Sequence, residues 1–434
     1  MPNPDDATST TEALYTCDEL TPGLCALRET TGTLLVRGLR LNYKIFDPPS
    51  TSPPPPPSTL PIVMVHGGPG WSHDYMLPLK QQACRGRRVI FYDQVGAGLS
   101  ERPASANATA PWLLSLDYYP QELQRLVDHL QLGRFHLLGS SWGTVVAQLY
   151  ALQTPPPPQL ASLVLSGPLS DGQLYIRSQW DEVEGGLGTL PPFTKRRIRR
   201  LEALPGGFET DEYKLLNEAL EAAFTVRTFP APDCFRASAA GVNAEVYVGM
   251  QGASEFTIGG ALAFWSVTEQ LRRVATPALL THGAFDTMRP PVLRAMAAAL
   301  PHARVVQFPH SGHCSMIDDP QLMNDAVAEF VSCVEASGAD AAACAEGGEY
   351  SGGGLHLQPP TASRLVADAS HESSWPTALA IGSFGGTQPG SWIPLLLLVQ
   401  VAVLLLGAYG LARARRMERQ QRERTASTPA AALV

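Results

Sequence analysis

The pentapeptide Gly139-Ser140-Ser141-Trp142-Gly143 constrains the fold of this chain more than any other stretch. The apolar run Phe135-His136-Leu137-Leu138 precedes it and predicts a buried strand, and residues 144–152 can form a helix. A G-x-S-x-G sequence between a strand and a helix is typical of a strained turn that lifts the serine hydroxyl above a sheet. The glycines leave room for strand and helix to approach closely. Ser140 shares the turn, but Ser141 holds its central position, so we predict that Ser141 is a nucleophile.

Short apolar runs on both sides of this turn alternate with helical patterns. The runs predict buried strands at 61–65, 88–93, 135–138, 160–166, 278–282 and 303–308. Helical spacing of apolar residues predicts helices at 120–132, 291–300 and 320–335. Residues 32–37 and 39–45 alternate apolar and polar side chains and predict an antiparallel hairpin. Strands and helices that alternate through short loops predict an α/β fold with a mostly parallel, doubly wound sheet.

The stretch between the fourth and fifth of these core strands has a different character. Residues 171–275 contain mainly helical patterns, so we expect a helical cap over the carboxyl ends of the strands, where open α/β sheets bind ligands. The predicted organisation is a polar N-terminal segment (1–30), the first part of the core (31–170), the cap (171–275), the second part of the core (276–335), a flexible linker rich in Gly, Ala, Ser and Pro (336–391), a transmembrane helix (392–412) and a basic tail (413–434).

The predicted transmembrane helix carries no charged residue over a length that can span a bilayer. Trp392 and Tyr409 lie near its ends, where interfacial aromatic residues belong. Met1 to Leu20 shows no signal-peptide pattern, so we expect a single-pass C-terminal membrane anchor with the enzyme domain facing the cytosol. Six arginines beyond residue 412 and the glycosylation sequon at Asn107 favour the opposite side, and this alternative stays open.

Charge and cysteine usage exclude several functions. A net charge of −8 and the absence of a long basic block before residue 390 give nucleic-acid binding no electrostatic support. The seven cysteines show no C-x-x-C or His/Cys spacing, so we expect no metal site and no cofactor. Their odd number fits free thiols, although Cys17 with Cys25, and Cys333 with Cys344, could pair in an oxidising compartment.

Attack by a serine on a carbonyl carbon needs a base and an acid that orients the base, and in this fold both follow the serine in the chain. Asp286 follows the predicted strand at 278–282, and His313 follows the one at 303–308. His310 competes with His313, but Gly312 gives His313 the tighter turn. We therefore predict that Ser141, Asp286 and His313 form a catalytic triad.

Four other aspartates could supply the acid. Asp74 and Asp93 precede the serine and break the chain order, and we expect Asp318 and Asp319 to cap the helix at 320–335. None of the four is therefore preferred to Asp286.

The loop after the first long strand is expected to form the oxyanion hole. Gly67 and Gly68 let a backbone N–H approach the developing negative charge without a side chain in the way, and the N–H of Trp142 is the second donor. We assign His66 a structural role, in which it bonds to the loop backbone.

Three stretches in this order carry a family resemblance: His66-Gly67-Gly68-Pro69-Gly70, the segment from Asp93 to Ser100, and the pentapeptide around Ser141. Together they resemble the signatures of the proline iminopeptidases, serine aminopeptidases of the α/β-hydrolase superfamily. Residues 250–260 are similar to a cap segment of the subgroup that includes the tricorn-interacting aminopeptidase. The resemblance covers about residues 30–335 and implies the same triad. It also implies that Glu255 reaches from the cap to the free α-amino group of the substrate.

Two positions depart from the family pattern. Val95 stands where the second signature usually has arginine, and Thr287 stands where some relatives have a second acid after the catalytic aspartate. The resemblance therefore implies serine hydrolysis more firmly than a preference for proline.

The leading hypothesis is a membrane-tethered serine hydrolase that removes N-terminal residues, proline among them, from short peptides through an acyl-enzyme. An esterase, lipase or amino-acid amidase acting on small esters or amides could use the same core. A non-catalytic binding protein with a hydrolase fold is a hypothesis of another class, and an intact triad argues against it.

Overall fold

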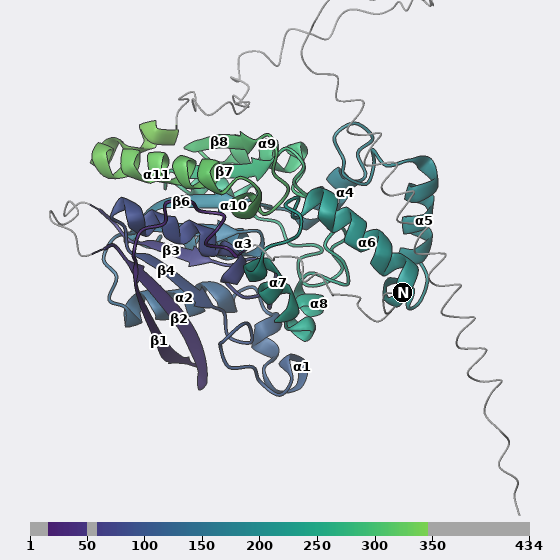
Figure 1. Ribbon diagram of the computed structural model, residues 1–434, viewed down its shortest axis with the longest axis horizontal. Coiled ribbons are helices and arrows are strands. Elements are labelled where there is room, and N and C mark those ends of the chain that lie inside the picture. The colour runs from purple at the N-terminus through teal and green to yellow at the C-terminus, as the bar shows by residue number, and fades with distance from the viewer. Residues whose placement is uncertain (1–15, 50–58, 346–434) are drawn as a thin grey trace, which may run out of the picture. The chain divides into compact units, whose positions relative to one another are not determined.

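The computed structural model of this chain describes residues 16–49 and 59–345 (Figure 1). Within them, a single sheet of eight strands has the order β1-β2-β4-β3-β5-β6-β7-β8. The strands are β1 (Arg28–Val36), β2 (Leu39–Asp47), β3 (Ile62–Val65), β4 (Val89–Asp93), β5 (Phe135–Ser140), β6 (Leu160–Ser166), β7 (Ala278–Gly283) and β8 (Ala303–Phe308).

Most neighbouring strands of the sheet are parallel. β1 and β2 form an antiparallel hairpin, and β2 also pairs with β4 in the antiparallel sense. From β4 to β8 every neighbouring pair is parallel. Every residue of β3, β4 and β5 is buried, because helices cover both faces of the parallel part. The predicted hairpin and mostly parallel sheet are confirmed.

The two faces of the sheet belong to two separate cores. Val63 and Val65 of β3 pack into a cluster with α2 (Tyr118–His129), α3 (Trp142–Ala151) and α9 (Pro290–Ala299). Ile62 and Met64 pack into the other cluster, with η1 (Asp74–Arg85), α10 (Ser315–Asp318) and α11 (Pro320–Ser337). This division follows from the strand itself, because alternate side chains point to opposite faces.

The chain between β6 and β7 consists of helices joined by loops, and none of the described residues 167–277 belongs to a strand of the sheet. They are α4 (Gly172–Gln179), α5 (Pro192–Glu202), η3 (Gly207–Glu209), α6 (Asp211–Phe224), α7 (Asp233–Ala240), α8 (Ala244–Met250) and η4 (Gln270–Arg273). Residues 209–219 are the described part of a second compact unit, in which the acidic Asp211 and Glu212 occupy the first turn of α6. Negative charge is favourable at a helix N-terminus.

Side chains on neighbouring loops fix where two of these helices begin. Asp171 accepts a hydrogen bond from the N–H of Leu174 at the start of α4, at 2.5 Å. Asn243 accepts one from the N–H of Val246 at the start of α8, at 3.3 Å. Such caps satisfy N–H groups that have no partner within the helix. The remaining elements are short: α1 (Ala106–Thr109), η2 (Pro111–Leu114) and η5 (Gly338–Ala345).

Six of the seven cysteines form disulfides, and Cys314 is free and buried. The pairs are Cys17–Cys234, Cys25–Cys84 and Cys333–Cys344. The pairing of Cys333 with Cys344, which the sequence left open, is found, whereas the possible pairing of Cys17 with Cys25 is wrong and a single free thiol, that of Cys314, remains. The reason is the path of the N-terminal segment, which brings each of its cysteines to a helix far away in the sequence.

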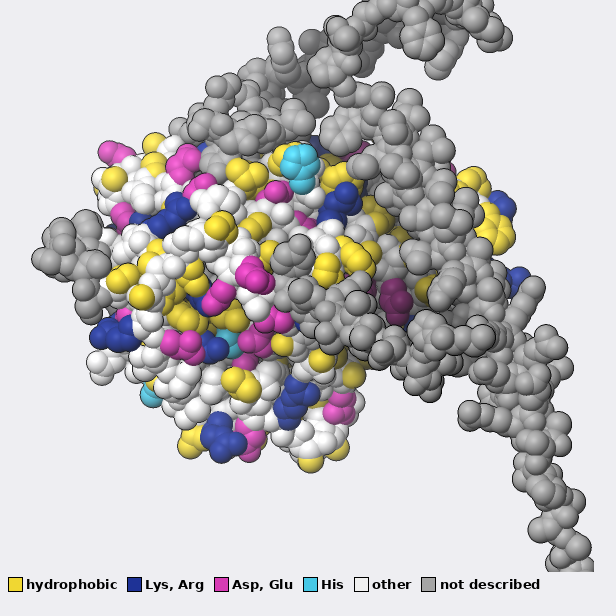
Figure 2. All heavy atoms as spheres, viewed as in Figure 1, with side chains coloured by type: hydrophobic (Ala, Val, Ile, Leu, Met, Phe, Trp, Pro, Cys, Tyr) yellow, Lys and Arg dark blue, Asp and Glu magenta, His cyan; other side chains and the backbone are white. Residues whose placement is uncertain are grey.

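No helix among the described residues is both long and apolar enough to cross a bilayer. The predicted transmembrane helix at 392–412, most of the linker and the basic tail lie outside the described residues. On the face of the molecule in Figure 2, acidic, basic and hydrophobic side chains are interspersed among the described residues, so charge of neither sign gathers there.

Candidate active site

Ser141 lies in a strained turn between β5 and α3. Its backbone has φ 54° and ψ −121°, in the positive-φ region that residues with a side chain rarely adopt. Its N–H donates to the carbonyl of Ser166 at 2.8 Å, which ties the turn to the end of β6. A Cβ at Gly139 would lie 2.3 Å from the carbonyl oxygen of Gly143, and one at Gly143 would lie 2.1 Å from that of Val65. Both glycines are therefore required by close packing.

Asp286 and His313 meet beyond the ends of two neighbouring strands, β7 and β8. The Nδ1 of His313 lies 2.6 Å from Oδ1 of Asp286, and both side chains are buried. The N–H of Met288 donates to the same carboxylate oxygen at 2.8 Å, and the hydroxyl of Thr287 donates to it at 3.4 Å. The bonds from Met288 and Thr287 fix the carboxylate, and the carboxylate holds the Nδ1 edge of the imidazole. The Nε2 of His313 is buried and has no hydrogen-bond partner in the described part of the chain.

A single peptide unit after β6 adjoins both the serine and the histidine. The carbonyl of Ser166 accepts the N–H of Ser141. The next residue, Gly167, has φ +56°, and a Cβ on it would lie 2.6 Å from Cε1 of His313 and 3.3 Å from Oδ2 of Asp286. All three predicted triad residues are thus gathered around the end of β6, although no hydrogen bond joins Ser141 to His313 among the described residues. Such bonds are often long before substrate binds.

The electrostatics of His313 suit a general base. Burial lowers the pKa of its imidazole, but the charge of Asp286 and the hydrogen bond to it more than offset this, so the pKa is raised above 6.5. The imidazolium is therefore stabilised by a carboxylate that cannot itself reach water.

The rival acids and base occupy other positions. His310 is exposed, whereas His313 is buried. Asp318 accepts the N–H of Gly312 at 2.8 Å, and Asp319 accepts the hydroxyl of Ser311 at 2.6 Å. Asp319 occupies the N-cap position of α11, but neither side chain bonds to the first N–H groups of that helix, so the expected side-chain cap is not formed. Both carboxylates instead bind the loop that carries His313, through the N–H of Gly312 and the hydroxyl of Ser311.

Asp93 belongs to the second signature segment, and His73 and Leu99 hold its carboxylate. It accepts the Nδ1 and the backbone N–H of His73, at 2.8 and 2.9 Å, and the N–H of Leu99 at 2.9 Å. Burial raises the pKa of Asp93, but the charge of His73 and these bonds outweigh it and bring the pKa to about 2. Asp74 accepts the hydroxyl of Ser72 at 2.6 Å. Both aspartates therefore hold the loop structure.

The glycine loop after β3 packs directly on the serine turn. A Cβ at Gly67 would lie 2.6 Å from Cβ of Ser141. The N–H of Gly67 donates to the hydroxyl of Tyr75 at 2.7 Å, so this donor is already used. The N–H groups of Gly68 and Trp142 make no hydrogen bond within the described part of the chain, and both residues line the same pocket. Of the two glycines, Gly68 is thus the one free to bind an oxyanion.

His66 has the structural role expected from the sequence. Its Nδ1 lies 2.9 Å from the carbonyl oxygen of Gly67, and its Nε2 accepts the N–H of Gln94 at 3.1 Å. The side-chain oxygen of Gln94 accepts the indole N–H of Trp142 at 2.9 Å. Both sides of the expected oxyanion hole are therefore tied to Gln94.

A pocket adjoins Ser141 and contains the predicted cap residue Glu255. Its space, including the part open to solvent, is about 300 Å³. It is lined by Gly68, Pro69, Ser141, Trp142, Leu169, Tyr175, Gln251, Glu255, Ile258, Leu262 and Met288. Glu255 supplies the only carboxylate of this lining, and most of the other side chains are apolar. The lining therefore brings one carboxylate and several apolar side chains next to Ser141.

Glu255 is fixed by tyrosines. The hydroxyl of Tyr247 donates to its Oε2 at 3.1 Å, and that of Tyr175 donates to its backbone carbonyl at 2.5 Å. Burial raises the pKa of Glu255, although the nearby His313 and the bond from Tyr247 partly offset this. A partly desolvated carboxylate binds an ammonium group strongly through charge-assisted hydrogen bonds.

Two residues that the sequence analysis missed bind the backbone of the first two signature segments, at Gly67 and Val95. Tyr75 holds Gly67, as described above. Glu122 of α2 is fully buried and accepts the N–H of Val95 at 3.0 Å and the hydroxyl of Tyr118. Burial raises the pKa of Glu122 to about 8. Its place among the apolar positions of α2, beside Leu123, was the signal that could have revealed it.

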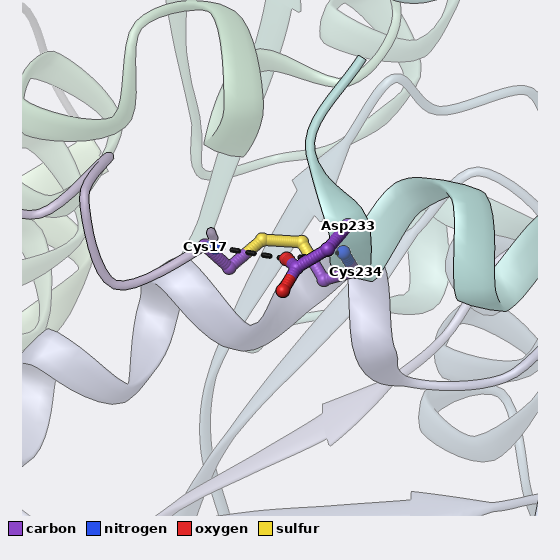
Figure 3. A group of neighbouring side chains, drawn as sticks. All are labelled: Cys17, Asp233 and Cys234. Carbon is purple, nitrogen blue, oxygen red and sulfur yellow. Dashed lines mark hydrogen bonds between the residues drawn. A yellow bond between two sulfur atoms is a disulfide. The ribbon is translucent and has the colours of Figure 1, made fainter. Parts of the chain in front are cut away.

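The described residues contain a single group of side chains with metal-ligand geometry: Cys17, Asp233 and Cys234 (Figure 3). The two sulfur atoms are joined to each other, and one carboxylate oxygen of Asp233 accepts the N–H groups of Cys17 at 3.0 Å and Cys234 at 2.6 Å. A disulfide offers no thiolate, so this group is a cross-link and not a metal centre.

Comparison with known proteins extends over the same part of the chain. A family model described as alpha/beta hydrolase fold matches residues 61–320. The chain is 31% identical to a proline iminopeptidase of Heyndrickxia coagulans over 306 residues, which cover 70% of this chain and 99% of the relative. It is 33% identical to the proline iminopeptidase of Lactobacillus crispatus, over 59% of this chain and 85% of the relative. The crystal structure of the proline iminopeptidase from Mycobacterium smegmatis superposes with a TM-score of 0.64 at 28% identity, over 71% of this chain and 99% of that one.

Proposed function

The chain belongs to the proline iminopeptidase family of the α/β-hydrolase superfamily, and we propose that it releases N-terminal residues from short peptides by attack of Ser141 on the first peptide bond. The observation that carries the proposal is that Ser141 and the carboxylate of Glu255 line one pocket. A nucleophile and a fixed negative charge in the same space suit a substrate whose scissile carbonyl lies next to a free amine.

The proposed reaction uses each group in turn. Oγ of Ser141 attacks the scissile carbonyl carbon while Nε2 of His313 takes the hydroxyl proton, and Asp286 holds the imidazole in the tautomer that makes this possible. The N–H groups of Gly68 and Trp142 bind the oxyanion. His313 then gives the proton to the leaving amine nitrogen. A water molecule then gives a proton to His313 and attacks the acyl carbon, the ester bond to Oγ breaks, His313 returns the proton to Oγ of Ser141, and the N-terminal amino acid leaves.

Glu255 accounts for the preference for a free N-terminus in this proposal. An α-ammonium or a protonated prolyl nitrogen would donate to the carboxylate, and Tyr247 would keep that carboxylate in place. The side chain of the first residue would lie against Leu169, Ile258, Leu262 and Met288, all of which line the pocket. An esterase or lipase has no need of a carboxylate at this position, and a binding protein has no need of the Asp286–His313 pair.

A substrate panel tests the proposal. We expect release from the naphthylamides of proline, alanine and leucine, and strong loss of rate when their amines are acylated. Short acyl esters serve as the comparison, because they lack the amine. Turnover of the esters alone, unaffected by blocking the amides, would contradict the aminopeptidase assignment.

The same proposal includes a membrane anchor at residues 392–412. Its support is the uncharged sequence of this segment and the aromatic residues near its ends. We expect the full chain to stay with membranes in alkaline carbonate and to be released by detergent. Truncation after residue 391 should release an active enzyme, and a truncated chain that still behaves as an integral membrane protein would contradict the anchor.

A further inference from the structure

The N-terminal segment is bound covalently to two distant parts of the fold. Cys17 is joined to Cys234 in α7, across 217 residues of sequence, with the Cα atoms 5.9 Å apart. Cys25 is joined to Cys84 in η1, across 59 residues, with the Cα atoms 5.6 Å apart. Both Cα separations fall in the usual range for disulfides. A third pair, Cys333–Cys344, closes the end of α11.

These cross-links bear on the elements that shape the site. α7 and η1 are also held together by Ser238, whose hydroxyl lies 2.8 Å from that of Ser72 and accepts the N–H of Tyr75 at 3.3 Å. Tyr75 in turn holds Gly67 of the glycine loop. The N-terminal segment therefore fastens both partners of a contact that supports the oxyanion loop. Disulfides of this kind persist in oxidising compartments and are rare where glutathione keeps thiols reduced.

A second observation, independent of the cysteines, concerns the sequon Asn107-Ala108-Thr109. Asn107 is exposed at the beginning of α1, on a surface loop of the core. Its Nδ2 donates to Oε1 of Glu245 at 2.7 Å. An amide nitrogen carries two hydrogens, so a sugar on one leaves the other to keep this bond. A sugar on the hydrogen that does not face Glu245 would leave this contact to α8 in place.

We propose that the catalytic domain matures in an oxidising compartment of the secretory pathway, and that Asn107 carries an N-linked oligosaccharide there. The six arginines after residue 412 agree with this topology, because positive residues flank a span on its cytosolic side. The proposal thus takes the alternative orientation that the sequence left open, opposite to the cytosol-facing one expected from the N-terminal sequence.

The chemistry needs two co-reactants that such a compartment supplies. Each disulfide forms by thiol–disulfide exchange with a disulfide-bonded oxidant, which is reduced to two thiols. For the glycan, Nδ2 of Asn107 forms a bond to C1 of an oligosaccharide carried on a lipid diphosphate. The bond from C1 to the phosphate oxygen breaks, the lipid diphosphate leaves, and the amide nitrogen loses one proton.

The oxidation state of the cysteines tests the first part of the proposal, maturation in an oxidising compartment. The full chain is produced in eukaryotic cells, and the cells are lysed in a thiol-blocking reagent. We expect a single blocked cysteine, Cys314, after denaturation without reduction, and all seven after reduction. Seven blocked cysteines without reduction would overturn the proposal. Zinc bound to unpaired Cys17 and Cys234 would also overturn it, since a reduced pair beside Asp233 offers metal ligands.

The glycan is tested in the same sample with an N-glycosidase. The mass should fall on treatment, the Asn107→Gln variant should show no such loss, and the matched Thr109→Ser variant should keep it. Thr109→Ser preserves both the sequon and the hydroxyl that donates to the carbonyl of Ser105. Oxidised cysteines with no glycan would overturn the assignment of Asn107. Labelling of Ser141 by a fluorophosphonate, measured alongside, reports on the enzyme function separately.

Discussion

The imidazole of His313 and the carboxylate of Asp286 form a buried pair, with Nδ1 and Oδ1 2.6 Å apart. β7 and β8 are neighbouring parallel strands, so the loops that follow them meet at one edge of the sheet. Gly167 lies against the pair because it has no side chain to displace either residue. The contact between these two side chains raises the pKa of His313.

In the pH profile of kcat/KM, the midpoint of the acid limb should lie above pH 6.5, the ordinary pKa of a histidine. Burial lowers the pKa of His313, but Asp286 raises it further than burial lowers it, and the base works only when neutral. Asp286→Asn removes the charge that raises the pKa, so the limb should move to lower pH while kcat falls by about 10⁴-fold. A limb that stays in place in the variant, measured by pH-rate profiles, would contradict this cause.

Gly167→Ala should impair catalysis without abolishing the fold. The new Cβ would lie within 2.7 Å of two atoms of the His313 ring, at a φ of +56° that alanine adopts with strain. We expect kcat to fall at least about tenfold and the free energy of unfolding to fall by about 1–3 kcal/mol. Gly133→Ala is the control, because a Cβ there meets nothing within 4 Å. Equal effects of the two substitutions on kcat would refute the role of Gly167.

Glu255→Gln should raise KM for substrates with a free amine by about 10- to 100-fold, since a charge-assisted hydrogen bond is lost. Short esters should be little affected, because they have no ammonium to bind. Glu269→Gln, at an exposed position between β6 and β7, provides the matched control. An equal loss on amides and esters would show that Glu255 is structural.

Glu122→Gln should flatten the dependence of stability on pH. Burial raises the pKa of Glu122 from 4.5 to about 8 in the folded protein. Below pH 4.5 the carboxyl is protonated in both the folded and the unfolded chain. Between pH 4.5 and about 8 it ionises in the unfolded chain but stays protonated in the folded one, so the free energy of unfolding falls as the pH rises. The full loss is on the order of 5 kcal/mol. Denaturant unfolding at several pH values should show a smaller loss for the glutamine variant, and parallel curves for both proteins would contradict the prediction.

Local signals explain why much of the sheet could be predicted from the sequence. The strands of the parallel part are short and rich in apolar residues, with β3 wholly apolar, and the hairpin at β1 and β2 alternates about Gly38, so each element can be recognised from a few consecutive residues. The glycine spacing around Ser141 reflects contacts of the turn with Gly143 and Val65 that recur wherever such a turn is built. The order of serine, acid and base along the chain then identifies the loops after β7 and β8, which the structure brings together.

Contacts between distant segments could not be predicted in this way. Cys17 lies eight residues from Cys25, yet its partner Cys234 is 217 residues away, and only the path of the N-terminal segment decides between them. Gly67 and Gly68 look equivalent in the sequence, but the hydroxyl of Tyr75 occupies the N–H of Gly67 alone. Asp318 and Asp319 precede a helix and resemble caps, yet the loop around Gly312 binds Asp318 instead.

The rate of release from proline naphthylamide by the Ser141→Ala variant decides whether Ser141 is the nucleophile. Removal of the attacking oxygen should lower kcat by about 10⁴-fold or more and abolish labelling by a fluorophosphonate. Ser140→Ala, at the neighbouring buried position, should keep both the activity and the label. If the Ser141→Ala variant released the product at the wild-type rate, an acyl-enzyme on this serine would be contradicted.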